Sequence, residues 1–207
     1  EERAHPNFEI EPRYWMLKTT AEHRFRRTIG NGIMFAFRGV ARPWTGQRCG
    51  KATILPRYPA THTLPVLTVS TDRALEFIGV FNSSTLDFLG RGHMPGAHVK
   101  TVWMLSQVPA PLPGTMDKRV TEHAARLSLT SHSVAWLFNR EPHPWNPEER
   151  YALDVEIDAL VAHVYGLTRA QYEVVLDSFE VLARIEVGKH DRYKFKEDCL
   201  AAYERGR

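Results

Sequence analysis

The chain has 207 residues, of which 43% are hydrophobic, and a formal net charge of +3. This apolar content is sufficient for the core of one domain or of two small ones. No apolar run reaches the roughly 18 residues that a transmembrane helix needs, and the two cysteines, Cys49 and Cys199, lack the CxxC spacing of a zinc or redox motif. We therefore expect a cytoplasmic protein without a membrane segment, a disulfide framework or a metal site. The first residues are Glu1 and Glu2 rather than Met, which favours a fragment of a longer protein.

The charge is divided unevenly along the chain. Residues 24–101 contain eleven Lys or Arg against three Asp or Glu, a net charge of +8, whereas residues 146–207 contain nine against thirteen, a net charge of −4. A basic segment with aromatic residues among the charges is typical of a nucleic-acid-binding surface, because Lys and Arg that neutralise phosphates release condensed counterions. We expect the acidic segment to point away from the nucleic acid.

The first half of the chain predicts a small sheet followed by helices. Short runs rich in apolar and β-branched residues are bounded by Gly and Pro, as strands are, at residues 33–40, 52–58 and 64–70. Residues 71–89 have helical spacing, with a break or a second helix cap at 82–84. Residues 98–105 predict a further strand, and the proline-rich segment 108–114 predicts a linker.

The second half of the chain is predicted to be helical. Residues 117–129 and 131–139 have helical spacing, and a proline cluster follows them. Near the C-terminus, Thr168 and Gln171 form the pattern of a capping box at the start of a further helix. The apolar stripe expected on the buried side of that helix consists of Tyr172, Val175, Leu176 and Phe179.

A longer helix is predicted between these two parts. Asn146 is expected to cap it, with Pro147 in the first helical position and Glu149 completing a capping box, and Gly166 is expected to end it. Its apolar residues share one face, so the helix should contribute to the core. These residues are Leu153, Ile157, Leu160, Val161 and Val164.

Segments along much of the chain carry a family resemblance. Those in the last third are EIDALVAHVYGL at 156–167, TRAQYEVVLDSF at 168–179 and YKFKEDCLAAY at 193–203. They resemble the C-terminal tail of bacterial adenine-specific DNA methyltransferases of the combined restriction-and-modification type (type IIG) and of related phage-defence methylases. Upstream segments resemble the target-recognition region of the same family: FRGVAR at 37–42, TILP at 53–56, HTLP at 62–65, VFNS at 80–83, and residues 96–109.

The resemblance has two departures in the segment expected to meet DNA. Gly39 replaces the Asp that is usual in the family, and PWTGQ at 43–47 replaces the usual ATNE. The DNA target of relatives is therefore not carried over. The resemblance implies an α+β fold in which a β-containing target-recognition region, residues 1–114, precedes a helical C-terminal region, residues 115–207.

The motifs of methyl transfer are missing from the sequence. The family needs a glycine-rich turn for S-adenosylmethionine and an Asn/Asp-Pro-Pro-aromatic loop for the flipped adenine, but Asn146-Pro147 is followed by Glu148 and no other match occurs. We therefore expect no catalytic residue and no cofactor in this chain. The resemblance implies that duplex DNA is bound for a catalytic domain, in cis or in trans, that uses S-adenosylmethionine.

Two groups of residues are predicted to contact DNA in different ways. Gln47, Arg48 and Lys51 lie in a glycine-containing segment and suit base reading, because Arg can form a bidentate pair with guanine and Gln with adenine. Arg24, Arg26 and Arg27 suit the phosphate backbone, which fixes register without carrying sequence information. The full predicted DNA-binding set is Arg26, Arg27, Arg42, Trp44, Gln47, Arg48, Lys51, Arg57, Arg91, His93, His98 and Lys100.

Several residues also have simpler interpretations. Trp44 suits stacking on a base and equally suits covering an apolar edge. His93, His98 and Lys100 lie in a glycine-containing segment where DNA contact is favoured over a solvated loop. His163, on the long apolar helix, is expected to pack or to form a hydrogen bond rather than to bind a metal.

Two other functions remain open at this stage. The chain could be a protein-interaction subunit of a defence complex, in which the helical tail docks on a partner and the basic charge is incidental. A nuclease with an unrecognised site is a weaker alternative. Glu186 and Lys189 place a carboxylate near a lysine, but no known nuclease signature is present.

Overall fold

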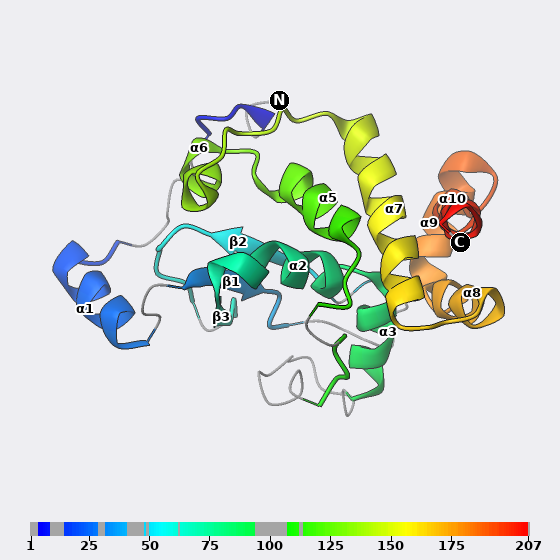
Figure 1. Ribbon diagram of the computed structural model, residues 1–207, viewed down its shortest axis with the longest axis horizontal. Coiled ribbons are helices and arrows are strands. Elements are labelled where there is room, and N and C mark those ends of the chain that lie inside the picture. The colour runs from blue at the N-terminus through cyan, green and yellow to red at the C-terminus, as the bar shows by residue number, and fades with distance from the viewer. Residues whose placement is uncertain are drawn as a thin grey trace.

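The computed structural model describes residues 4–8, 15–28, 32–40, 48, 50–61, 63–93, 107–111 and 114–206, with all their side chains except those of Arg27 and Thr28. The fold is α+β, as predicted, with a small antiparallel sheet and a helical C-terminal region (Figure 1). No helix in these ranges is long and apolar enough to cross a membrane.

The sheet has three strands in the order β2-β1-β3. The central strand, β1 (Ile33–Phe37), pairs antiparallel with β2 (Ala52–Leu55) and with β3 (Val66–Val69), and all five of its residues are buried. The three strands predicted for the first half of the chain are confirmed, but each is shorter than expected. β2 stops before Pro56 and β3 begins after Pro65, because proline has no N–H to donate to a strand ladder.

Two helices follow the sheet, with a break where the sequence predicts it. α2 (Thr71–Phe81) packs on the sheet, and α3 (Ser84–Gly92) starts after Asn82 and Ser83. Phe35 of β1 meets Phe77 and Phe81 of α2 edge to face, with ring centroids 4.7 and 4.9 Å apart. This aromatic cluster fixes the α2 helix on the sheet.

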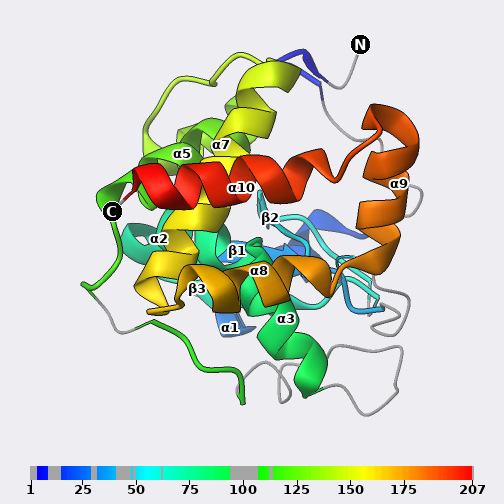
Figure 2. The same ribbon diagram turned by 90° about the vertical axis from the view of Figure 1, so that its right-hand side faces the viewer.

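The remaining helices form a second layer. They are α5 (Lys118–Ser128), α6 (His132–Ala135), the 3-10 turn η3 (Trp136–Phe138), α7 (Pro147–Val164), α8 (Arg169–Asp177), α9 (Glu180–His190) and α10 (Lys194–Arg205). The helix α1 (Lys18–Thr28), which the sequence analysis did not predict, lies at one end of the long axis of the molecule, and α8, α9 and α10 lie at the other (Figures 1 and 2).

The long helix α7 is capped as predicted, except for one side chain. Asn146 accepts hydrogen bonds from the backbone N–H groups of Glu148 and Glu149, and Gly166 adopts a φ of +68° just beyond the helix end. The carboxylate of Glu149 does not complete a capping box. It binds Arg126 and His143 instead, and so ties α7 to α5 and to the preceding loop.

The helix α7 buries two faces rather than the single face that was predicted. Ile157 and Val161 pack in a core with the sheet, α2 and α5, whereas Val155, Ala159 and Ala162 pack in a second core with α8 and α10. Because α7 carries apolar residues on both of these faces, it can lie between the two cores.

The first core crosses the predicted boundary between residues 114 and 115. It combines Phe35 and Ile78 from the first region with Val120 and Leu160 from the second. Pro109, in the predicted linker, is also tied to the second region. Its carbonyl accepts a hydrogen bond of 2.8 Å from the hydroxyl of Tyr165, which follows α7. The two regions therefore share one core. The strand predicted for residues 98–105 lies outside the described residues.

The crossing of α2 and α5 depends on a glycine. A Cβ added at Gly79 would lie 2.7 Å from Cγ1 of Val120, which is β-branched and fully buried. We expect Gly79→Ala to lower the free energy of unfolding by about 1–3 kcal/mol, measured by urea unfolding followed by circular dichroism.

Gly188 in α9 is the matched control for this substitution. An added Cβ there meets nothing within 4 Å among the described residues, so Gly188→Ala should raise the free energy of unfolding by about 0.5–1 kcal/mol through helix propensity. An unfolding midpoint of Gly79→Ala at or above that of the wild type would contradict the close approach of α2 and α5.

Candidate nucleic-acid interface

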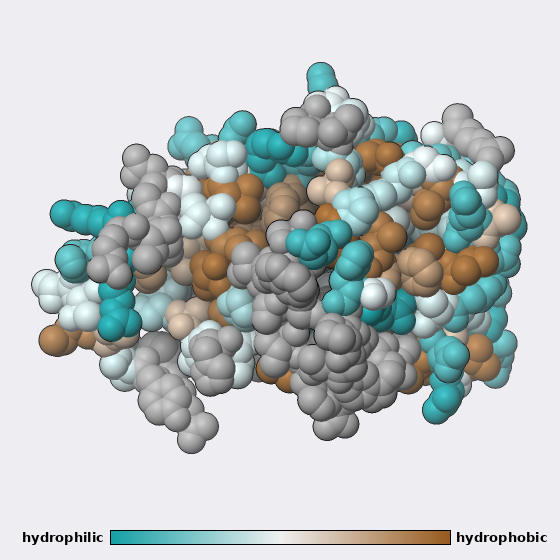
Figure 3. All heavy atoms as spheres, turned by 90° about the horizontal axis from the view of Figure 1, so that it is seen from below, coloured by the Kyte–Doolittle hydropathy of each residue, from teal (hydrophilic) through white to brown (hydrophobic). Residues whose placement is uncertain are grey.

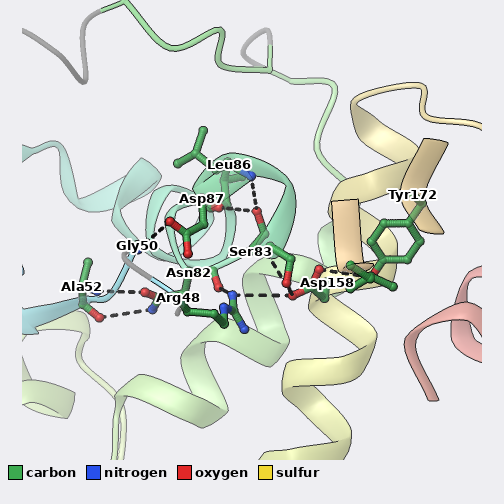
Figure 4. Close-up of polar contacts among 12 residues, drawn as sticks. Arg48, Gly50, Ala52, Asn82, Ser83, Leu86, Asp87, Asp158 and Tyr172 are labelled. Atoms are coloured by element: carbon green, nitrogen blue, oxygen red, sulfur yellow. Dashed lines mark hydrogen bonds and ion pairs between the residues drawn. The ribbon is translucent and has the colours of Figure 1, made fainter. Parts of the chain in front are cut away.

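Arg48, predicted to read bases, points into the protein. Its guanidinium donates a hydrogen bond to the Asn82 carbonyl and lies 3.6 Å from Oδ2 of Asp158, with 12% of the Arg48 side chain and 2% of the Asp158 side chain exposed (Figure 4). Burial would lower the pKa of Arg48, but the Asp158 and Asp87 carboxylates raise it above its usual value. This placement does not present Arg48 to a DNA groove.

Asp158 is held by groups from two other helices, in addition to Arg48. Ser84, at the start of α3, donates its backbone N–H and its hydroxyl to Oδ2 at 3.0 and 2.8 Å, and the Tyr172 hydroxyl of α8 donates to Oδ1 at 3.1 Å. Burial raises the pKa of Asp158, against the effect of Arg48 and of these donors. The carboxylate therefore joins α3, α7 and α8 to residue 48.

The segment after Arg48 is fixed by the junction between α2 and α3. The Gly50 N–H donates to Oδ1 of Asp87 at 2.9 Å, and Asn82 binds both the N–H and the carbonyl of Ala52 through its side-chain amide at 2.8 and 3.1 Å (Figure 4). Together with the contacts of Arg48 and Asp158, these bonds form what we call the polar clamp, defined as Arg48, Asn82, Ser84, Asp87, Asp158 and Tyr172. The clamp positions the start of β2.

Lys51 follows Gly50 in the clamped segment, and part of its surface is exposed while the rest is covered by the protein. The charge of the neighbouring Arg48, followed by burial, lowers the pKa of Lys51 to about 8. Because the folded-state pKa is lowered, the unfolded chain binds more protons above pH 8, and the contribution of Lys51 to stability rises with pH through that window. Near neutral pH the Lys51 side chain is cationic.

The other predicted DNA-binding residues fall into three groups. Arg26 on α1, Arg57 after β2 and His93 after α3 are exposed. Arg91 of α3 instead turns toward α8, where it donates to the carbonyl and hydroxyl of Ser178 at 3.1 and 2.6 Å and lies 4.1 Å from the Phe179 ring centroid. The side chains of Arg27, Arg42, Trp44, Gln47, His98 and Lys100 lie outside the described residues.

The structure brings Arg48 and Lys51 together but spreads the exposed members of the set. α1 lies at one end of the molecule, while α3 lies near the helices of the other end (Figure 1). Viewed from below, hydrophilic side chains protrude at the end where α1 lies (Figure 3). The exposed basic side chains of the predicted set, as far as the structure describes them, therefore lie on separate elements of the N-terminal region.

Several basic side chains of the C-terminal helices are paired with acids. Arg169 binds Glu173 and Glu204 at 3.0 and 2.7 Å, Lys194 binds Asp198 at 2.6 Å, and Lys196 binds Asp177 at 2.7 Å. This pairing neutralises positive charge at the end of the molecule that carries the acidic segment.

His163 takes the packing role that the sequence predicts. Its ring stacks on the Tyr203 ring at a centroid distance of 3.9 Å, and its Nε2 lies 2.8 Å from the Tyr203 carbonyl oxygen. Among the residues that the structure describes, no cluster of His, Cys, Asp or Glu could hold a metal ion.

Sequence reasoning missed the acceptors of the polar clamp. Asp158 lies between Ile157 and Ala159 on an otherwise apolar part of α7, and a buried carboxylate needs a cationic or hydrogen-bonding partner. That position was the available signal, although nothing local in the sequence identifies Arg48 as the partner. No protein-family model, curated protein or solved structure matches the chain.

Breaking the Arg48–Asp158 pair should destabilise the fold strongly. We expect Asp158→Ala to lower the free energy of unfolding by about 3–5 kcal/mol, because it leaves a buried guanidinium without its counter-charge. The double variant Arg48→Met with Asp158→Leu should recover part of this loss, because it removes both charges. Urea unfolding measures all three free energies.

Arg169→Ala is the matched control, because it removes only exposed ion pairs, with Glu173 and Glu204, and should change the free energy of unfolding little. Equal small losses for Asp158→Ala and Arg169→Ala would show that the clamp does not hold the fold together.

The pKa of Lys51 gives a direct test of its contact with Arg48. An NMR titration of the lysine side chains should show Lys51 losing its proton near pH 8. In Arg48→Gln the largest cause of the shift is removed, so the pKa of Lys51 should rise. A Lys51 pKa that is the same in both proteins would contradict this electrostatic contact.

Proposed function

We propose that this chain binds duplex DNA as the specificity part of an adenine-specific DNA methyltransferase of the restriction-modification or phage-defence type. The catalytic domain, which uses S-adenosylmethionine, is supplied in cis or in trans by sequence other than these 207 residues. In this proposal the chain positions a DNA sequence and performs no methyl transfer itself.

The observation that carries the proposal is the unequal treatment of positive charge in the two halves. Arg26 and Arg38 are exposed and have no acidic partner among the described residues, and Lys51 is also exposed. Exposed Lys and Arg on a segment of net charge +8 attract phosphates. Residues 146–207 carry a net charge of −4, and most of their basic side chains are paired with acids, with Arg184 and Lys189 as exposed exceptions among the described residues, so this segment attracts phosphates less.

The polar clamp supports the same proposal. It fixes the backbone of residues 50 and 52 against the α2–α3 junction, and Lys51 lies between them. A cationic side chain on a rigid backbone loses less conformational entropy when it binds DNA than a cationic side chain on a mobile loop. Arg48 takes part by positioning this segment and not by reading bases.

A second candidate, a protein-interaction subunit, is favoured by apolar side chains at the other end of the molecule. Val174 of α8 and Ile185 and Val187 of α9 are 62%, 59% and 46% exposed. Such side chains suit contact with another protein. In that case DNA binding would be weak and incidental.

Salt dependence separates the two candidates. If about three phosphate contacts form, the logarithm of the DNA affinity should fall with the logarithm of the salt concentration with a slope of about −2.7. Arg26→Ala should weaken binding to all sequences alike and reduce the slope by about one unit. Fluorescence anisotropy with a labelled duplex measures both effects.

Arg192→Ala is the control, because Arg192 is exposed and binds Glu197 at the other end of the molecule. Its affinity and salt slope should equal those of the wild type. Duplex affinity that does not change with salt would overturn the DNA-binding proposal in favour of the protein-interaction subunit. Methyl transfer from labelled S-adenosylmethionine by the purified chain would contradict the absence of catalysis.

A further inference from the structure

Three consecutive large apolar side chains are exposed immediately before α1. Trp15, Met16 and Leu17 are 81%, 45% and 76% exposed. Single exposed apolar residues are ordinary on protein surfaces, whereas contiguous ones mark interaction sites. The neighbouring helix indicates the kind of partner.

The helix α1 carries several exposed basic side chains. Lys18, His23, Arg24 and Arg26 are exposed, and Glu22 is the only acidic residue of the helix. Lys18 lies 3.9 Å from Glu22, with 89% of the Lys18 side chain exposed, so this ion pair is weak. The helix stands at the edge of the molecule, away from the C-terminal helices (Figure 1).

We propose that residues 15–26 form a DNA-binding arm, in which α1 lies along the phosphates and the apolar side chains of residues 15–17 insert against the bases. This inference rests on the proposed function and adds residues 15–18 to the interface. An apolar wedge beside basic residues is a known way of opening a base step.

The distribution of apolar residues favours DNA over a membrane surface. A helix that lies in a membrane interface needs a broad apolar face along its length. Within the helix, only Ala21 and Phe25 are apolar, and both are partly buried. The exposed apolar residues Trp15, Met16 and Leu17 precede the helix, and we call them the tip of the arm. They do not form an apolar face along the helix.

The test compares the tip with an equivalent exposed aromatic elsewhere. In the double variant Trp15→Ala with Leu17→Ala, the affinity of the whole chain for a labelled duplex should fall by at least about fivefold, because stacking on a base is lost. The salt slope should stay unchanged, since no cation is removed. Trp15→Phe, which keeps an aromatic ring, should retain most of the affinity.

Trp136→Ala is the matched control. Trp136 is 78% exposed on η3, and its removal should leave the affinity unchanged. Lys18→Ala should instead reduce the salt slope by about one unit, as loss of a phosphate contact does. Because residues 15–17 are exposed and contribute to neither core, the thermal unfolding midpoint of the double variant should equal that of the wild type.

The outcomes distinguish this inference from the proposed function. Salt-dependent duplex binding that is the same in the wild type and the double variant would overturn the arm and leave the proposed function standing. A wild type without salt-dependent duplex binding would overturn both. Loss of binding to phosphatidylglycerol vesicles in the double variant, with duplex binding intact, would assign the tip to a membrane surface and overturn the arm.

Discussion

The buried carboxylate of Asp158 is the constraint around which the elements of this protein are arranged. It lies on α7, the helix that separates the two cores, and it takes hydrogen bonds from α3 and α8 and an ion pair from Arg48. A carboxylate removed from water is costly unless its oxygens are satisfied. The groups that satisfy it come from segments far apart in the sequence, so the charge can be buried only when those segments are in place.

This arrangement links the helical layer to the segment that precedes β2. Arg48 spans the distance to α7, and Asn82 and Asp87 fix the backbone on either side of Lys51. One charged interaction in the interior thus positions a cationic side chain at the surface. The Arg48 guanidinium also lowers the pKa of Lys51, because the two cations lie close together.

The surface is divided along the long axis of the molecule. α1 and its exposed bases lie at one end, and helices with paired charges and several exposed apolar side chains lie at the other (Figure 1). An anionic partner and an apolar partner would therefore meet different ends. In the function that we propose, DNA and the catalytic domain would be bound at these two different ends.

Local patterns in the sequence determined most of the elements, although not α1, and the tertiary structure decided which charges are available for binding. The Asn146 cap, the Thr168 capping box and the break at Asn82 were predictable, because caps and turns depend on neighbouring residues. The sequence also determined the uneven distribution of charge. It could not distinguish Arg48 and Arg91, which turn inward, from the exposed Arg26 and Arg57, since the partners of the first two lie in distant helices. The second buried face of α7 was missed for the same reason: its role depends on α8 and α10, which pack against it only in the folded chain.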